Sequence, residues 1–245
     1  MGLVQGITEF LPVSSTAHLN LLSARLGKKP DLTSDTVLHL GSLTATLFWL
    51  YRRREQLPYR DRHFWEKVIV ATVPVGMTGF LFEKPLQKLR RPGLTASLLI
   101  TGGVALWITD YATRQTQGQC DLSDLKHLSY GQCVGIGLAQ TLALLPGLSR
   151  SGMTQMAGRW SGLSATAAQT FSFVLAVPVV SASAAFEMRH LSWGEAKTLL
   201  PAGLSAAASS HFMLDKVDRF SKGPAYQALG LYRILLGAYL LKNHR

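Results

Sequence analysis

Long apolar segments, separated by short polar and charged ones, run along almost the whole chain. Nearly all Lys, Arg, Asp and Glu residues lie between these segments, which is where a chain that crosses a bilayer must place its charges. Several segments are shorter than the ~20 residues that a full span needs, so flanking residues must supply the remaining length. The pattern predicts an all-α integral membrane protein, a single polytopic domain with about six transmembrane helices. The predicted helices lie at residues 36–51, 68–82, 94–109, 165–186, 199–214 and 225–241.

The chain carries a formal net charge of +11. Such a basic balance is typical of nucleic-acid-binding proteins, but no nucleic-acid-binding module is recognisable in the sequence. The basic residues instead cluster beside apolar segments, as Arg52, Arg53 and Arg54 do directly after LFWLY. Arginines in that place anchor a chain to anionic lipid headgroups. We therefore expect the membrane bilayer, and no nucleic acid, as a partner.

Two further apolar segments, 2–19 and 131–154, carry polar residues in their middles. In each segment a proline, Pro12 or Pro146, is closely followed by hydroxyl residues, so a continuous membrane helix is not expected. Broken backbone at membrane depth must be buried in protein or line a cavity. The two segments are therefore predicted to be re-entrant helical hairpins.

The two hairpin segments also resemble each other. LPVSST at 11–16 corresponds to LPGLSRS at 145–151, and each is preceded by a glutamine, Gln5 or Gln140. The correspondence predicts an inverted repeat with units of roughly 1–110 and 131–245. Membrane proteins built in this way place their site where the two repeats meet.

The first hairpin segment concentrates ionisable and hydroxyl side chains: Glu9, Ser14, Ser15, Thr16 and His18. A carboxylate in an apolar segment is costly, which favours a functional role. Glu9 can bind a metal or act as a base, and the hydroxyls can attack a phosphoryl group or hydrogen-bond to it. The imidazole can activate a hydroxyl or protonate a leaving group. The alternative is an ordinary helix start with a histidine at the membrane interface.

The second hairpin segment carries PGLSRSG at 146–152, followed by Thr154. Its glycines permit close approach of a ligand to the backbone, and amides at a helix start bind anions. Arg150 offers a planar fork that matches phosphate oxygens. The alternative is an interfacial loop whose arginine reaches the headgroups. Together the two segments supply acid/base groups and an anion clamp, which suits phosphoryl transfer.

These motifs resemble those of the undecaprenyl-diphosphate phosphatase family of the bacitracin-resistance type. The family's first motif stands as QGITEFLPVSSTAH at 5–18 and its second as PGLSRSGMT at 146–154. The resemblance implies hydrolysis of undecaprenyl diphosphate to undecaprenyl phosphate and inorganic phosphate, which recycles the lipid carrier for cell-wall synthesis. It also implies a multi-pass protein of the bacterial inner membrane with its active site facing the periplasm. A divalent cation, Mg²⁺ or Ca²⁺, is the implied cofactor.

The resemblance also assigns roles to residues. Four are expected to be catalytic: Glu9, Ser15, His18 and Arg150. Glu9 is also the expected metal ligand, and the choice of Ser15 or His18 as nucleophile stays open. The residues expected to line the substrate site are Gln5, Ser14, Thr16, Gln140, Ser149, Ser151 and Thr154. One departure concerns the metal: Gln5 stands where many family members have a glutamate, so a second carboxylate is missing.

Two other ionisable residues in apolar helices are assigned no part in the chemistry. His39 is a lone histidine, which is more often a satisfied interior group, and Arg233 is expected to pair with a carboxylate or reach a headgroup. A rival function is a transporter or flippase of undecaprenyl phosphate, because paired hairpins in an inverted repeat suit that equally well. The expected partners are a polyprenyl diphosphate lipid and the bilayer, with a homodimer as a further candidate assembly.

Overall fold

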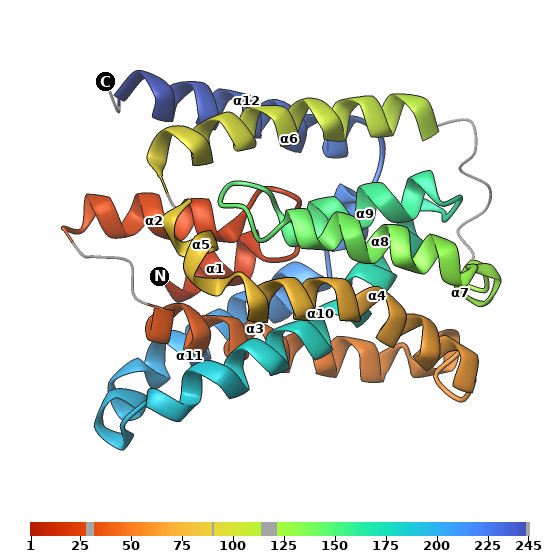
Figure 1. Cartoon of the computed structure of the whole chain (residues 1–245), viewed down its shortest axis with the longest axis horizontal. Coiled ribbons are helices and arrows are strands. Elements are labelled where there is room, and N and C mark those ends of the chain that lie inside the picture. Colours follow the sequence, from red (N-terminus) through yellow and green to blue (C-terminus); the bar gives the residue numbers. More distant parts are fainter. Residues whose placement is uncertain (28–31, 90, 114–121, 244–245) are drawn as a thin grey trace.

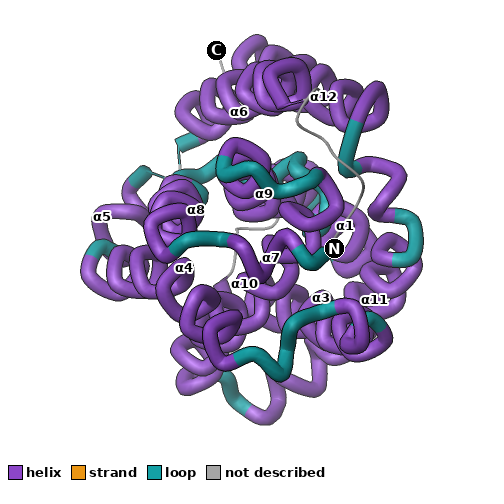
Figure 2. Tube along the Cα trace, turned by 90° about the vertical axis from the view of Figure 1, so that its right-hand side faces the viewer, coloured by secondary structure: helices purple, strands orange, loops and turns teal. Residues whose placement is uncertain are grey.

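A computed structural model of the chain describes residues 1–27, 32–89, 91–113 and 122–243, and among them only helices, turns and loops occur, with no strand (Figure 2). Within these ranges, six long helices of 20–23 residues correspond to the six predicted apolar segments. They are α3 (Leu32–Arg52), α4 (Arg62–Leu81), α6 (Pro92–Thr113), α10 (Ala165–Glu187), α11 (Trp193–Leu214) and α12 (Gly223–Asn243). The prediction of an all-helical chain is confirmed.

Three of these helices, α4, α6 and α10, are long and apolar enough to cross a membrane. A helix of this length extends about 30 Å, which is the thickness of the hydrocarbon core of a bilayer. The other three long helices carry polar residues that are buried: Thr36, Ser42 and Thr46 in α3, Ser209 and Ser210 in α11, and Arg233 in α12. These side chains lower the hydropathy of their helices, but they face the protein interior.

Each of the two polar segments forms two helices, and its proline lies in the connection between them. The first consists of α1 (Gly2–Thr8) and α2 (Ser15–Arg25), and the second of α8 (Tyr130–Leu142) and α9 (Arg150–Trp160). Each connection contains a residue with positive φ, Ser14 at 70° and Gly147 at 101°, which lets the chain turn. We call residues 2–25 the first hairpin and residues 130–160 the second hairpin.

Short helical pieces connect the longer ones. They are η1 (Arg54–Gln56), α5 (Glu83–Lys88), α7 (Asp124–His127), η2 (Met188–His190) and η3 (Val217–Phe220). Helix α11 begins at a capping box in which Ser192 and Glu195 each bond the other's backbone amide. The short helices and the caps thus define where the long helices begin.

The hairpins lie in the middle of the molecule, between the α6–α12 pair and the group formed by α3, α4, α10 and α11 (Figures 1 and 2). Helices α6 and α12 run side by side along the top of Figure 1. The first helix of each hairpin packs against a long helix from the other half of the chain, since α1 contacts α11 and α8 contacts α4. Helix α10 contacts α3, α4 and α9. Helices from both halves therefore hold the hairpins at the centre.

Small residues let these helices approach closely. A Cβ atom on Gly103 of α6 would lie 2.6 Å from the carbonyl oxygen of Gly230 on α12. A Cβ atom on Gly137 of α8 would lie 2.6 Å from the carbonyl oxygen of Ala71 on α4. Both distances are shorter than van der Waals contact, so only glycine fits. Close backbone packing of this kind is a main source of helix association in lipid.

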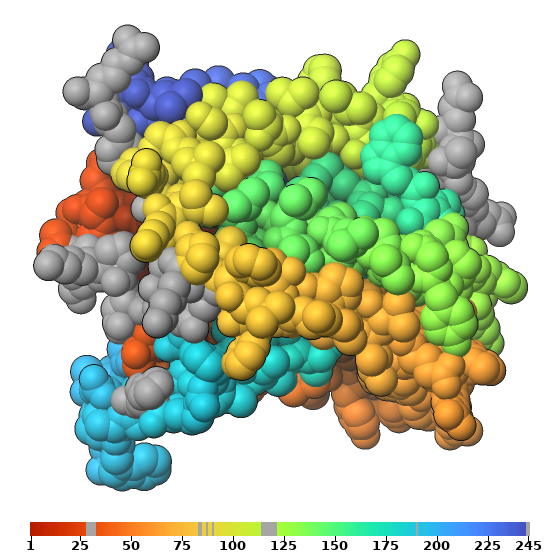
Figure 3. Space-filling model, in the orientation of Figure 1, coloured from red at the N-terminus to blue at the C-terminus, as the bar shows by residue number. Residues whose placement is uncertain are grey.

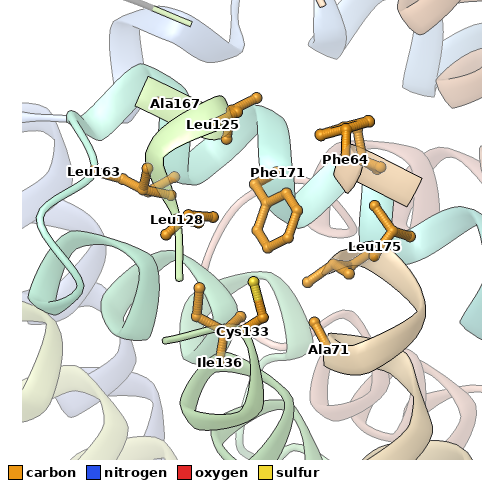
Figure 4. Packing of buried hydrophobic residues seen from close by; sticks show 13 residues of the cluster. Phe64, Ala71, Leu125, Leu128, Cys133, Ile136, Leu163, Ala167, Phe171 and Leu175 are labelled. Carbon is orange, nitrogen blue, oxygen red and sulfur yellow. The ribbon is translucent and has the colours of Figure 1, made fainter. Parts of the chain in front are cut away.

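Buried apolar clusters anchor both hairpins on α10. One cluster joins α4, α8 and α10 through residues that point toward one another in Figure 4: Phe64, Ala71, Cys133, Ile136, Phe171 and Leu175. A second cluster holds the first hairpin through Phe10, whose ring meets that of Phe173 edge-on with centroids 5.3 Å apart. Trp49 of α3 contacts the same Phe173 ring at 5.4 Å. The aromatic side chains of α10 therefore fix the position of the first hairpin.

The outer surface is rich in large apolar side chains. Along α4, the residues Ile69, Val73, Met77 and Phe80 are all exposed and recur at three- or four-residue intervals, which places them on one outward face. Helices α4 and α6 form much of the face seen in Figure 3. A continuous apolar surface of this kind marks a surface that is covered in the functional state. In a membrane protein the bilayer covers it.

Candidate active site

The Glu9 carboxylate is the centre of the site and is bound through both of its oxygens. Oε1 accepts a hydrogen bond of 2.9 Å from Arg150 Nη2, which joins the two hairpins. Oε2 accepts hydrogen bonds from Ser15 Oγ at 2.8 Å and from Gln5 Nε2 at 3.1 Å. The glutamate side chain is only 8% exposed. Its charge is therefore balanced by these partners, and above all by the guanidinium group.

The backbone of the first hairpin presents Glu9 and Ser15 to the same space. Glu9 directly follows α1, Ser15 is the first residue of α2, and the turn between them passes through Ser14 in the left-handed region. That conformation costs a residue with a side chain about 1–3 kcal/mol. The ring of His18 supports it, because Nδ1 donates a hydrogen bond of 2.8 Å to the Ser14 carbonyl oxygen.

The other ring nitrogen of His18 is also engaged. Nε2 lies 2.6 Å from the hydroxyl of Tyr232 on α12, and the two rings stack with centroids 5.6 Å apart. A carbonyl oxygen can only accept, so Nδ1 carries a proton, and in the neutral ring Nε2 then accepts from the tyrosine hydroxyl. Both nitrogens are therefore committed to holding α2 and its first turn in place.

The second hairpin presents Arg150 at the first position of α9. Ser149 caps this helix, since its hydroxyl oxygen accepts a hydrogen bond of 3.2 Å from the Gly152 amide. Arg150 Nη1 donates to the Ser172 carbonyl oxygen at 3.0 Å, and Thr154 Oγ1 donates to Ser172 Oγ at 2.7 Å. Helix α10 thus fixes one arm of the guanidinium group and leaves the other directed at Glu9.

The two hairpin turns are in direct contact. Ser151 Oγ donates to the Leu11 carbonyl oxygen at 3.0 Å, which adds a second bridge to the Arg150–Glu9 ion pair. The N-terminus of the 11-residue helix α9 lies at this point. The amides of its first turn and the arginine together create a positive potential that favours an anion.

A cavity of about 180 Å³ adjoins these groups, and its wall is part polar and part apolar. The predicted site residues that line it are Glu9, Ser14, Ser15, Thr16, Gln140, Ser149, Arg150 and Ser151. The apolar part of the wall includes Val75 of α4, Leu144 and Leu148 of the second hairpin, and Val179 and Val180 of α10. One ligand with a charged head and an apolar tail can therefore be bound by a single cavity.

Three predicted site residues lie behind the cavity wall and are not among the described residues that line it. Gln5 lies behind Glu9 and donates to it. Thr154 lies behind Arg150 and bonds the same residue of α10. His18 supports the turn before α2. Each of the three contacts a residue that does line the cavity.

The sequence led us to interpret His39 of α3 as an interior group, but the structure places it at the site. Its ring lines the cavity, and Nδ1 lies 2.8 Å from Gln5 Nε2 and 3.4 Å from Glu9 Oε2. A sequence signal for it exists: the polar residues Thr36, His39, Ser42 and Thr46 recur at three- or four-residue intervals, the spacing of one helix face. A polar stripe inside an apolar helix indicates a face turned toward a site.

Arg233 also differs from expectation, because it neither pairs with a carboxylate of the described residues nor reaches a headgroup. It is 1% exposed. Its guanidinium group donates to the carbonyl oxygens of Pro12 at 2.7 Å and Gly147 at 3.0 Å, one in each hairpin turn. Longer bonds of 3.4 Å reach the carbonyl oxygens of Leu98 and Leu99 on α6. Arg233 therefore ties both turns to each other and to α6.

The donor atoms around Glu9 fit a divalent cation only in part. Among the described residues, no group of three or more His, Cys, Asp or Glu side chains could hold a metal ion. Glu9 supplies one carboxylate, and the nearby buried amide oxygen Gln5 Oε1 has no hydrogen-bond partner in the described part of the chain. A cation held here must take further ligands from a bound phosphate group, as Mg²⁺ does in phosphoryl-transfer sites.

The chain is similar to known proteins over almost its whole length. Residues 1–239 match the family model described as bacitracin resistance protein BacA. Undecaprenyl-diphosphatase of Moorella thermoacetica is 34% identical over 254 residues, which cover 98% of this chain and 94% of the relative. Undecaprenyl-diphosphatase 2 of Stutzerimonas stutzeri is 35% identical over 266 residues, which cover 98% of this chain and 95% of the relative. Undecaprenyl-diphosphatase of Campylobacter fetus is 32% identical over 254 residues, which cover 98% of this chain and 95% of the relative.

Proposed function

The chain belongs to the bacitracin resistance protein BacA family, and we propose that it hydrolyses undecaprenyl diphosphate to undecaprenyl phosphate and inorganic phosphate, recycling the lipid carrier for cell-wall synthesis. The relatives named undecaprenyl-diphosphatase, which match over almost their full length, support this activity. The structural observation that carries the proposal is the Arg150–Glu9–Ser15 cluster on the wall of a partly apolar cavity.

The two parts of the cavity wall fit the two parts of the lipid. The diphosphate head is bound by Arg150 and by the amides at the start of α9. The first isoprene units lie against the apolar residues around Leu148 and Val179. The remainder of a C55 chain is far too large for about 180 Å³ and extends between helices into the bilayer.

Ser15 is the group best placed to attack. Its hydroxyl donates to Glu9 Oε2 at 2.8 Å, the geometry of a nucleophile and its general base. In the proposed reaction Ser15 Oγ bonds to the terminal phosphorus and its proton passes to Glu9. The bond from that phosphorus to the bridging oxygen breaks, and undecaprenyl phosphate leaves with the oxygen. Water then cleaves the phosphoserine, which releases inorganic phosphate and restores the hydroxyl.

The position of His18 supports the choice of Ser15 as nucleophile. Its ring nitrogens are committed to the Ser14 carbonyl oxygen and to Tyr232, and it is absent from the described residues that line the cavity. A histidine in that position holds Ser15 at the start of α2. We therefore assign His18 as a positioning residue and Glu9 as the general base.

Arg150 stabilises the charge that develops on the phosphoryl oxygens. A guanidinium group has five N–H donors, of which two are used by Ser172 and Glu9. We also propose a divalent cation, for which the family resemblance implies Mg²⁺ or Ca²⁺, with Glu9 and the diphosphate oxygens as ligands. When bound, such an ion neutralises negative charge on the diphosphate.

We place the protein in the bacterial inner membrane, with the six long helices as spans, the hairpins re-entrant and the active site facing the periplasm. The outward apolar faces and the central, buried hairpins support this arrangement. The reciprocal packing of α1 on α11 and of α8 on α4 supports an inverted repeat with units of roughly 1–110 and 131–245. Under that repeat α1 is equivalent to α8, and α4 is equivalent to α11.

Reconstitution into vesicles separates the phosphatase from a transporter of undecaprenyl phosphate. A transporter needs the anion clamp but not an attacking hydroxyl. With undecaprenyl diphosphate supplied, wild-type protein is expected to release phosphate, and Ser15→Ala to release almost none. Ser97→Ala is the matched control, because the hydroxyl of this exposed serine bonds the backbone of its own helix α6 and, in the described part of the chain, no other group. Equal rates for Ser15→Ala and wild type, or lipid movement without phosphate release, would contradict the proposal.

A further inference from the structure

On the basis of the proposed hydrolysis, we infer that the prenyl chain of the lipid is bound between α4 and α10 and passes sideways from the cavity into the bilayer. The two helices run in the same direction and diverge toward their C-terminal ends, at the left of Figure 1. We call the space between residues 75–81 of α4 and residues 179–187 of α10 the fork. Val75 and Val179 line the cavity, as Arg150 does. A prenyl chain whose diphosphate head is bound by Arg150 therefore enters the fork directly.

The first halves of α4 and α10 are joined by buried apolar side chains. Phe64 and Ala71 of α4 lie in the same cluster as Phe171 and Leu175 of α10 (Figure 4). Within the described part of the chain, no residue of α4 beyond Ala71 and none of α10 beyond Leu175 belongs to this cluster. The apolar packing between the two helices therefore ends at Ala71 and Leu175.

Each of the two helices contains a proline just beyond that point. Pro74 of α4 and Pro178 of α10 both lie within the sequence VPV, three residues after Ala71 and Leu175 respectively. A proline inside a helix removes one backbone hydrogen bond and bends the helix, which allows two packed helices to separate. The valine that follows each proline lines the cavity. The cavity therefore lies at the base of the fork, where the helices part.

The two walls of the fork are accessible beyond the cavity. Gly79 lies one turn after Val75 on the same face of α4, and a Cβ atom there would meet no atom of the described residues within 4 Å. Ser183 lies one turn after Val179, lines the cavity and is exposed. Phe186 follows on the same face of α10 and is also exposed. The fork thus offers open space next to apolar side chains, as a prenyl chain requires.

The equivalent helix pair of the proposed inverted repeat is closed. Under that repeat α3 corresponds to α10, and α11 corresponds to α4. A Cβ atom on Gly41 of α3 would overlap the carbonyl oxygen of Gly203 on α11. Ser210 Oγ of α11 donates to Ser42 Oγ of α3 at 3.0 Å. Helices packed this closely leave no room for a lipid chain, so of the two equivalent pairs only α4 and α10 can receive it.

Photocrosslinking of the full chain in detergent micelles locates the prenyl chain. The probe is a non-hydrolysable prenyl methylenediphosphonate with a diazirine on its second isoprene unit, and mass spectrometry identifies the crosslinked peptides. We expect crosslinks within residues 75–81 and 179–187, and their loss when excess unlabelled diphosphonate is added. Crosslinks confined to other helices, crosslinks that the competitor does not reduce, or none at all would overturn the fork as the binding site.

Two variants that fill the fork test it by kinetics, each with a matched control on the same helix. Gly79→Phe and Ser183→Phe place a ring in the path of the prenyl chain but leave the residues that bind the diphosphate in place. Both are expected to raise KM for undecaprenyl diphosphate about tenfold, with kcat within about twofold of wild type. Gly76→Phe and Ser181→Phe, at exposed positions on other faces of α4 and α10, are the controls and should behave as wild type.

Phosphate release by the same wild-type preparation separates the fork from the proposed hydrolysis. Wild type that releases phosphate, while Gly79→Phe and Ser183→Phe keep the wild-type KM, would overturn the fork alone. Wild type that is crosslinked within the fork but releases no phosphate from undecaprenyl diphosphate would instead overturn the hydrolysis and leave the binding site in place.

Discussion

At the scale of single residues, the first motif contains side chains with two different tasks. Glu9 and Ser15 line the cavity and bond each other, whereas His18 bonds the backbone that presents them. Because Ser14 has a positive φ, the turn depends on support from outside its own backbone. In the proposed reaction, the motif therefore combines reacting groups with the group that maintains their geometry.

The positioning role of His18 makes a prediction that a proton-transfer role does not. Asparagine at this position can donate an amide N–H to the Ser14 carbonyl oxygen, as Nδ1 does. We expect His18→Asn to keep a substantial share of the wild-type kcat with an unchanged pH profile, whereas His18→Ala falls by about 10²-fold. Steady-state phosphate release across a pH series measures both.

Tyr232→Phe is the companion variant, because it removes only the hydroxyl that faces Nε2. It is expected to lower kcat by no more than a few-fold. If His18→Asn were as inactive as His18→Ala, His18 would have to transfer a proton and the positioning role would be wrong.

Part of the site could be predicted from the sequence and part could not. Glu9, Ser15 and Arg150 lie in two dense polar motifs within apolar segments, and the structure brings them into contact. His39 has a weaker signal, a polar stripe along α3. The Ser172 carbonyl that fixes Arg150 has no sequence signal, since every residue carries a carbonyl and only tertiary packing selects one.

At the scale of elements, apolar segments located the long helices but not their ends. The segment predicted at 199–214 begins at Trp193 in the structure, because the capping box of Ser192 and Glu195 starts the helix in a polar turn before the apolar stretch. Which helices pack together could not be predicted either. That choice depends on small residues such as Gly137, whose partner lies in a distant part of the chain.

Two glycines of α8 test this close packing as a matched pair. A Cβ atom at Gly137 would lie 2.6 Å from the Ala71 carbonyl oxygen of α4, whereas nothing lies within 4 Å of one at Gly135. We expect Gly137→Ala to lower the melting temperature in detergent, because α8 must move away from α4. Gly135→Ala is expected to leave it unchanged or raise it, since alanine favours a helix by about 1 kcal/mol over glycine. A Gly137→Ala protein as stable as Gly135→Ala would show that α8 and α4 do not pack this closely.

At the scale of the whole molecule, the site exists only where the two halves of the chain meet. Glu9 comes from one hairpin, Arg150 from the other, and α10 anchors both. Arg233 of α12 adds a further constraint through its bonds to the Pro12 and Gly147 carbonyl oxygens. A change at Arg233 should therefore alter the site without touching any residue that lines it.

Replacing Arg233 by lysine keeps the charge but not the fork that reaches both hairpin turns. We expect Arg233→Lys to lower the free energy of unfolding by about 1–3 kcal/mol, because buried carbonyl groups lose donors. Phosphate release should fall in parallel, with kcat affected more than KM. Lys242→Met, at an exposed position of the same helix, is the control. Full activity and stability in Arg233→Lys would show that the two turns do not depend on this clamp.

The most direct measurement is the initial rate of phosphate release from undecaprenyl diphosphate by the purified chain and by its Glu9→Gln variant. The glutamine keeps the shape of the side chain but loses the base and the charge that pairs with Arg150. The wild-type chain is expected to turn over the lipid, and Glu9→Gln to be slower by at least about 10²-fold. A wild-type chain that releases no phosphate with Mg²⁺, Ca²⁺, Mn²⁺ or Zn²⁺ present, or a Glu9→Gln variant as fast as wild type, would contradict the proposed reaction centre.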